Sequence, residues 1–265
     1  MVAMRVAVVQ MSSGIDSAAN RDQVSRVLSD LARELDDGID LVVLPEATMH
    51  DFGPRDHDLS AAAEPLDGPF VSLLAEQASR LGATVVAGMF ERTDGLPFNT
   101  LVAVGPHGEM AAHYRKIHLY DSFGYRESDR LAPGPIEPVI LDVAGLRLGL
   151  MTCYDLRFPE LGRALVDAGA LAFVVPSAWV AGPGKVHHWR TLVTARAIEN
   201  TVYVVAAAQN GEEYCGHSMI VDAAGSMVEE AGQGDAVLCA DLSATAVSEV
   251  RDANPSLLNR RMSMP

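Results

Sequence analysis

Two kinds of segment alternate along the first half of the chain. Short apolar runs rich in β-branched residues predict strands, and longer stretches with apolar residues three or four positions apart predict helices. The predicted order is a strand over 4–11, a helix over 20–35 that Asn20 caps and Leu35 closes, a strand over 40–46 ended by Pro45, a helix after Gly68-Pro69, a strand over 84–90 and a hairpin over 99–116.

The second half repeats this order. Its predicted elements are a strand over 146–153, a helix over 159–168, a strand over 171–179 ended by Pro176, a helix over 186–200, a strand over 201–211 and a hairpin over 216–232. Strands that are apolar throughout are typical of sheets covered on both faces. The repeat therefore predicts an α/β fold of pseudo-two-fold symmetry, a four-layer α-β-β-α sandwich.

We expect one domain over 1–265, because the chain shows neither a linker nor a low-complexity stretch. Residues 249–265 form a polar, proline-containing tail, which we expect to lie against a surface or a partner subunit. The first apolar run is better interpreted as a strand than as a signal peptide. No run approaches the roughly 18 apolar residues of a membrane span.

Charge and cysteine content narrow the function. The formal net charge of −15 argues against nucleic acid and anionic membranes as partners, since both select a basic face. The three cysteines, Cys153, Cys215 and Cys239, cannot all pair, and C-x-x-C does not occur. Free thiols are typical of a reducing compartment, so we expect a cytoplasmic protein.

Three ionisable residues follow predicted strands. Glu46 comes after LVVLP, Lys116 ends the second arm of the first hairpin, and Cys153 ends GLMTC. Strand ends of this kind build sites in α/β sheets. Each residue also has a plainer interpretation: Cys153 as a buried packing thiol, Glu46 as a cap and Lys116 as a solvated lysine.

The chemistry of the three residues is mutually consistent. A thiol must lose its proton to act as a nucleophile, and Glu46 is a candidate base. The Lys116 ammonium and the backbone N–H of Tyr154 are candidate donors to an oxyanion. The set suits addition and elimination at a carbonyl or nitrile carbon.

Several segments of the chain are distinctive in combination: DLVVLPE (40–46), YRKIHLYD (114–121), GYRESDRLAPG (124–134), CYDLRFPEL (153–161), PSAW (176–179), HHW (187–189), ARAIEN (195–200) and GHSMIVDAAG (216–225). Through them the sequence resembles the nitrilase superfamily of carbon–nitrogen hydrolases across nearly its whole length. The resemblance implies the same sandwich fold and a homodimer or larger homo-oligomer. It also implies a reaction that needs neither a metal nor an organic cofactor.

The resemblance assigns roles to six residues. It makes Glu46 the general base, Lys116 the oxyanion lysine and Cys153 the nucleophile that forms a thioester. It further implies that Glu127 orients the lysine or the substrate. Tyr154 and Trp179 fall where the family lines its pocket, although a core position is an alternative for Trp179.

Within the superfamily, the segments most resemble the small-amide branch, which includes ω-amidases and deaminated-glutathione amidases. Hydrolysis of a small linear carboxamide to an acid and ammonia is therefore expected. A nitrilase or an N-carbamoyl-amino-acid hydrolase is the alternative. Leu156 argues against a nitrilase, and the single Arg157 argues against an N-carbamoyl-amino-acid hydrolase. We expect Arg157 to form an internal ion pair, with contact to a substrate carboxylate as the alternative.

Three other hypotheses remain. One is a Cys–His hydrolase in which His187, His188 or His217 activates Cys153. A second is a metal site built from His113, His118, His187 and His188, although the first two are five apart on a predicted strand and so point to opposite faces. The third is a non-catalytic binding module, whose expected mark, loss of a signature residue, is not found.

Overall fold

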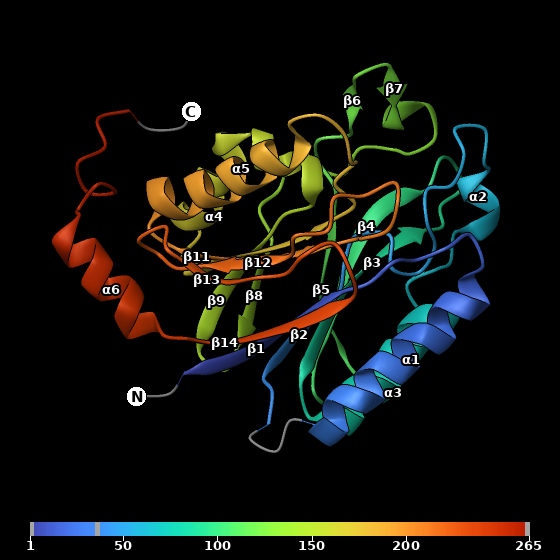
Figure 1. The fold of residues 1–265 in the computed structure, drawn as a ribbon, viewed down its shortest axis with the longest axis horizontal. Coiled ribbons are helices and arrows are strands. Elements are labelled where there is room, and N and C mark those ends of the chain that lie inside the picture. The colour runs from blue at the N-terminus through green and yellow to red at the C-terminus, as the bar shows by residue number, and fades with distance from the viewer. Residues whose placement is uncertain (1–2, 35–37, 263–265) are drawn as a thin grey trace.

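Two six-stranded sheets pack face to face between two layers of helices (Figure 1). The computed structural model describes residues 3–34 and 38–262. Figure 1 shows α1 and α3 together on one outer face and α4 and α5 together on the other. The predicted α-β-β-α sandwich is therefore confirmed.

The first sheet has the strand order β14-β1-β2-β3-β4-β5. Its strands are β1 (Met4–Gln10), β2 (Leu41–Val43), β3 (Thr84–Glu91), β4 (Phe98–Val104), β5 (Met110–Arg115) and β14 (Ala236–Leu242). Neighbours among β1, β2 and β3 are parallel, and β4, β5 and β14 are antiparallel to their neighbours.

The second sheet has the order β13-β12-β11-β10-β9-β8. Its strands are β8 (Ile140–Val143), β9 (Leu146–Leu150), β10 (Ala172–Ser177), β11 (Tyr203–Ala208), β12 (Met219–Val221) and β13 (Met227–Glu230). Here β9, β10 and β11 are the parallel strands. The repeat in the sequence thus becomes two sheets of the same plan.

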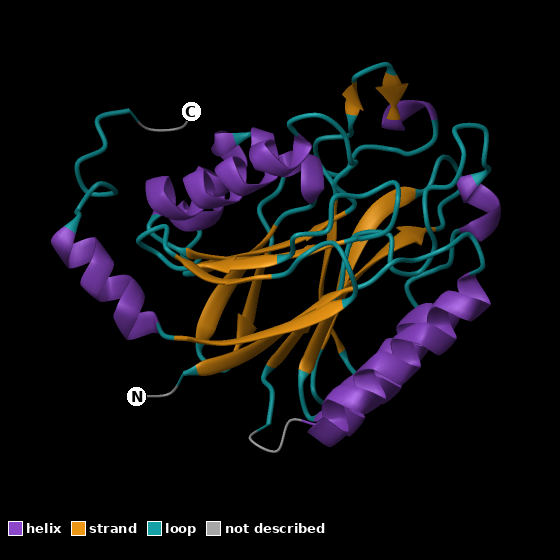
Figure 2. Ribbon diagram, viewed as in Figure 1, coloured by secondary structure: helices purple, strands orange, loops and turns teal. Residues whose placement is uncertain are grey.

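The helices are α1 (Ser17–Glu34), α2 (Leu59–Ala62), α3 (Pro69–Leu81), α4 (Pro159–Asp167), α5 (Lys185–Asn200) and α6 (Ala244–Ala253). A two-stranded hairpin of β6 (Asp121–Ser122) and β7 (Tyr125–Arg126) stands above the sandwich, as Figure 2 shows among the loops. Among the described residues, no helix is both long and apolar enough to cross a bilayer.

Strand alternation divides the buried side chains between two core layers. Along β1, Val6 and Val8 belong to the core between the sheets, whereas Ala7 and Val9 face the layer of α1 and α3. Successive strand side chains point to opposite faces, so an apolar run supplies both layers at once. This is why the strands are apolar throughout.

Some local predictions were wrong. Asp16, not Asn20, caps α1, because its Oδ1 accepts from the N–H groups of Ala18 and Ala19. Asn20 lies buried within the helix and donates to the carbonyl oxygens of Gly14 and Met49. The expected last residue of that helix, Leu35, lies outside the described residues.

Strand ends also differ from the predictions. Pro176 lies inside β10, opposite Ala207 of β11, and is tolerated because β9 pairs with β10 only as far as Val174. Four strands were not predicted. β8 and β14 pair with the outer edges of β9 and β1, and β6 and β7 form the short two-stranded hairpin. Cys239 lies in β14.

The C-terminal segment over residues 244–262 lies against the second half of the molecule, and residues 263–265 of the predicted tail lie outside the described residues. Val247 of α6 is buried, and Arg251 donates to the carbonyl oxygen of Thr201. Beyond the helix, Arg260 forms an ion pair with Asp167 at the end of α4, 2.6 Å apart. Leu258 and Met262 remain exposed.

Candidate functional site

Glu46 sits just beyond β2, in a loop pressed against β3. A Cβ atom on Gly88 of β3 would lie 2.7 Å from the Cα of Glu46, so glycine is required for the approach. The N–H of Gly88 donates to the carbonyl of Pro45, and Gln209 donates to the carbonyl of Glu46. The glutamate is thus held from both sheets, and its side chain is 1% exposed.

Lys116 directly follows β5. Its backbone N–H donates to the carbonyl of Asn99, and its own carbonyl accepts from the N–H of Gly134. Its Nζ lies 2.9 Å from Oε1 of Glu46 and 2.9 Å from Oε2 of Glu127. Burial alone would lower the pKa of Lys116, but the charges of Glu127 and Glu46 outweigh burial and hold its pKa well above the usual range. The ammonium is therefore kept charged.

Further donors satisfy the two carboxylates. Asn99 of β4 donates through Nδ2 to Glu46 at 2.7 Å and to Glu127 at 3.0 Å. The N–H of Ala178 donates to the other oxygen of Glu46 at 2.6 Å, and the N–H of Tyr120 donates to Glu127. Asn99 was missed from the sequence, where its only signal was an amide inside the apolar run FNTLVAV.

Cys153 follows β9, which ends at Leu150 rather than at the cysteine. Its φ of 47° places it in the left-handed region, where it opens a 3₁₀ turn over Cys153–Arg157. Burial, together with the charge of Glu46 and a hydrogen bond to it, raises the pKa of Cys153 well above the usual range, although Lys116 acts in the opposite direction. The resting sulfur is therefore a thiol beside a carboxylate.

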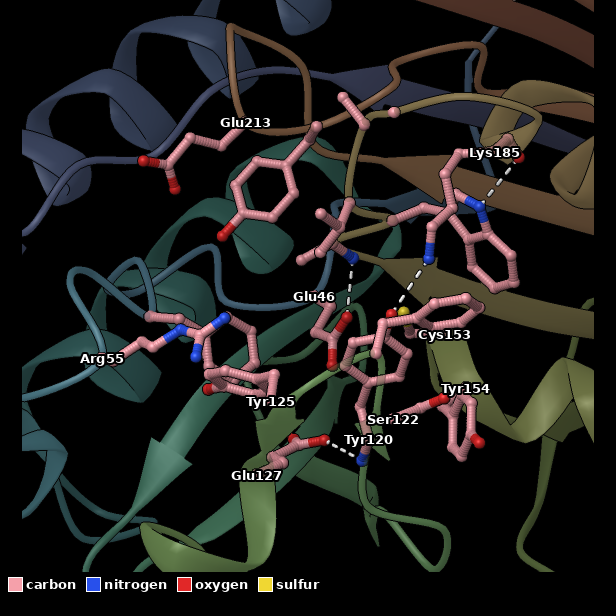
Figure 3. Close-up of a pocket in the computed structure, with 18 of the residues that line it drawn as sticks. Glu46, Arg55, Tyr120, Ser122, Tyr125, Glu127, Cys153, Tyr154, Lys185 and Glu213 are labelled. Atoms are coloured by element: carbon pink, nitrogen blue, oxygen red, sulfur yellow. Dashed lines mark hydrogen bonds between the residues drawn. The ribbon is translucent and has the colours of Figure 1, made fainter.

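A pocket of about 550 Å³ opens above these residues (Figure 3). Glu46, Lys116, Glu127 and Cys153 line it together with Tyr154 and Trp179, so all six predicted site residues share one cavity. Figure 3 shows Glu46 and Cys153 on the inner wall with the rings of Tyr120, Tyr125 and Tyr154 around them.

Arg157 also lines the pocket, and the expected internal ion pair was wrong. Its guanidinium lies 5.2 Å from the ring centre of Trp179 and 5.9 Å from that of Tyr154. Its buried Nε and Nη2 atoms have no hydrogen-bond partner among the described residues. Stacking on aromatic rings thus replaces a carboxylate partner, and two buried donors of Arg157 are left without a partner beside the pocket.

The β6–β7 hairpin forms part of the rim. The Nζ of Lys185 lies 4.0 Å from the ring centre of Phe123 and donates to the hydroxyl of Tyr120 at 3.0 Å. Arg55 donates to the carbonyl of Gly124 from the opposite side. The pocket mouth is therefore aromatic and carries Arg55 and Lys185, with Glu213 as an opposing charge.

The histidines of the other hypotheses lie elsewhere. His118 is beyond β5 rather than on it and bonds to Asp155, while His113 and His187 are exposed. His217 contacts Glu230, and none of these histidines, nor His188, lines the pocket. Within residues 3–34 and 38–262, no group of three or more His, Cys, Asp or Glu could hold a metal ion.

Comparison with solved structures places the fold in the nitrilase superfamily. XC1258 from Xanthomonas campestris, a CN-hydrolase superfamily protein with an arsenic adduct in its active site, is 32% identical with a TM-score of 0.88, and all of each chain is covered. The model of the carbon–nitrogen hydrolase family matches residues 5–252. The chain therefore belongs to the carbon–nitrogen hydrolase family.

Two relatives indicate which branch of the family the chain is most similar to. A deaminated glutathione amidase from Escherichia coli O157:H7 is 40% identical, covering 89% of this chain and 90% of its own. The human omega-amidase NIT2 is 30% identical, covering 98% and 96%. These findings confirm the predicted family, its amidase branch and hydrolysis of a carbon–nitrogen bond as the class of reaction.

Proposed function

We propose that the chain hydrolyses a small linear carboxamide to the free acid and ammonia through a thioester on Cys153. The observation that carries this proposal is the position of Glu46, which bonds Lys116 and the Ala178 N–H while also contacting the Cys153 thiol. One carboxylate can therefore exchange a proton with the sulfur while an ammonium stands beside the reacting carbon.

In the first half of the cycle, Glu46 accepts the thiol proton and the Cys153 sulfur attacks the amide carbon. The Lys116 ammonium and the Tyr154 N–H stabilise the oxyanion. As the carbon–nitrogen bond breaks, Glu46 returns its proton to the departing nitrogen, which leaves as ammonia. The carbonyl re-forms as a thioester.

In the second half, Glu46 removes a proton from water, and the hydroxide attacks the thioester carbon. The carbon–sulfur bond breaks, the sulfur regains the proton from Glu46, and the acid leaves. Glu127 holds Lys116 in place through two contacts, of 2.9 and 3.1 Å. In this cycle, neither a metal nor an organic cofactor takes part.

We place a carboxylate on the acyl part of the substrate. Arg157 lines the pocket, its buried Nε and Nη2 atoms have no hydrogen-bond partner among the described residues, and a guanidinium prefers planar, bidentate partners. The relatives named for deaminated glutathione support an amide of this kind, and deaminated glutathione is the first compound to assay. The single domain is proposed to work in the cytoplasm as a homodimer or larger homo-oligomer.

The test is ammonia release from a panel of ω-amides, deaminated glutathione, aliphatic amides, nitriles and carbamoyl amino acids. Glu46→Gln should abolish release while the circular dichroism spectrum is unchanged, and Glu229→Gln on the exposed β13 is the matched control. Full activity in Glu46→Gln would exclude the glutamate as the base. If the enzyme prefers nitriles or carbamoyl compounds, the proposed amide substrate is wrong and that class is the substrate instead.

The proposed thioester can be detected directly. Intact-mass measurement after rapid quenching should show an acyl adduct on Cys153 that is absent from Cys153→Ala. Absence of any adduct across the panel would contradict the thioester.

A further inference from the structure

Asp155 is a buried carboxylate that has no role in the proton transfers proposed above. It is 0% exposed, yet its two oxygens accept four hydrogen bonds. Oδ2 accepts from the Tyr114 hydroxyl at 2.7 Å and from the Thr152 N–H at 2.8 Å. Oδ1 accepts from the N–H of His118 at 3.2 Å and from its Nδ1 at 2.7 Å, which must donate because an ionised carboxylate can only accept.

The donors come from two distant segments of the chain. Tyr114 and His118 stand two residues before and two residues after Lys116, whereas Thr152 directly precedes Cys153. Asp155 itself lies in the turn that Cys153 opens. One carboxylate therefore joins the chain on both sides of the lysine to the chain around the thiol.

Ring contacts cross the same boundary. The His118 ring lies flat on Phe158, with centres 3.7 Å apart and planes at 5°. The Tyr120 ring meets Tyr154 edge to face at 5.0 Å. Residues 114–120 and 152–158 are thus joined by polar and aromatic contacts together.

The two segments belong to different sheets, since Lys116 follows β5 of the first and Cys153 follows β9 of the second. The sheets meet largely through apolar side chains, and apolar attraction has no preferred direction. Hydrogen bonds to a charged group are directional and stronger than those between neutral groups. Such hydrogen bonds can fix the position of one sheet relative to the other more closely than apolar packing does.

We propose that Asp155 is a positioning residue, which through Tyr114 and His118 sets the Lys116 ammonium in register with the Cys153 thiol. The inference rests on the roles proposed for Lys116 and Cys153. A displacement of about 1 Å between reacting groups can reduce a rate on the order of 100-fold. Loss of one donor should therefore be visible in kcat even when the fold survives.

Tyr114→Phe is the mildest test, because it removes one oxygen and keeps the buried ring. Burial and the charge of Asp155 raise the pKa of Tyr114 well above its usual range, so the hydroxyl remains a donor across the assay range. We expect kcat to fall about 10- to 100-fold with little change in KM. Tyr203→Phe is the matched control, a buried tyrosine at the opposite end of the strands.

The second readout is the rate at which iodoacetamide alkylates Cys153, followed by peptide mass spectrometry as a function of pH. The midpoint of this profile should move upward in Tyr114→Phe, because a displaced ammonium stabilises the thiolate less. His118→Ala should act in the same direction. His118→Asn, whose amide can donate from near the Nδ1 position, should recover much of the loss.

Because alkylation needs no turnover, it tests the positioning role even if the proposed amide hydrolysis fails. A midpoint that moves in Tyr114→Phe and His118→Ala, but not in Tyr203→Phe, supports the inference. If the two variants lose thermal stability but keep the wild-type kcat and midpoint, Asp155 only stabilises the fold and the inference is wrong.

Discussion

Nζ of Lys116 lies 2.9 Å from Oε1 of Glu46, although the two residues are 70 positions apart and their strands, β5 and β2, are separated by two others. Glu127 contacts the same ammonium through both of its carboxylate oxygens. One buried positive charge thus stands between two buried negative charges. The three charged groups stabilise one another, because a buried charge without a partner lowers the stability of the folded protein.

Lys116→Met should destabilise the protein strongly, since it leaves Glu46 and Glu127 close together without their cation. We expect a loss of about 3–5 kcal/mol in the free energy of unfolding. The double variant Lys116→Met/Glu127→Gln should regain part of this loss by removing one of the two carboxylates. Urea unfolding at pH 7.5 measures both, and wild-type stability in the single variant would contradict the predicted coupling.

Gly88→Ala should move the loop that carries Glu46. The added Cβ would lie 2.5 Å from the backbone nitrogen of Ala47, which is too close for the loop to stay in place. We expect a loss of about 1–3 kcal/mol in the free energy of unfolding, with a fall in kcat. Gly232→Ala is the control, because nothing lies within 4 Å of its Cβ position. Equal activity of the two variants would exclude the close approach as a requirement.

Stability should fall as the solution becomes alkaline, in part through Cys215. Burial raises the pKa of Cys215 to about 12. A thiol with a raised pKa in the folded state contributes stability that is complete below the unfolded pKa and is lost as pH rises through the folded value. The window therefore runs from near pH 9 to about 12.

Cys215→Ala isolates this contribution. Between pH 9 and 10.5, its free energy of unfolding should fall less steeply than that of the wild type, by up to about 1.4 kcal/mol per pH unit. Urea unfolding across this range measures the two slopes. Parallel slopes would show that Cys215 does not titrate differently in the folded and unfolded chains.

Arg157→Met should separate carboxylate-bearing amides from neutral ones. If the free donors of Arg157 bind a substrate carboxylate, KM for such an amide should rise about 10- to 100-fold, which corresponds to one charge-assisted contact. KM for a neutral aliphatic amide should change little. Arg92→Met, at an exposed position outside the pocket, is the control. An equal effect on both substrates would reject the contact.

Much of the fold was predictable because the apolar pattern is regular. The parallel strands and their helices were found where runs such as TVVAGMF or LAFVVPSAW place them. β8 and β14 were missed because half-polar segments such as AVLCADL become strands only when an edge is available to pair with. Asp16 was missed as the cap of α1 because Asn20 is an equally good capping residue.

The candidate site also combines features that the sequence predicted with features that depend on tertiary contacts. The sequence by itself predicted which residues carry the proposed chemistry, because Glu46, Lys116 and Cys153 each come at the end of a predicted strand, within segments that resemble the nitrilase superfamily. Only the tertiary structure decided that they meet, that Asn99 joins the predicted Glu127 in holding them, and that Arg157 lines the pocket without an ion pair. The physical reason is that burial, pairing and distance depend on contacts between segments far apart in the chain, which local pattern does not specify.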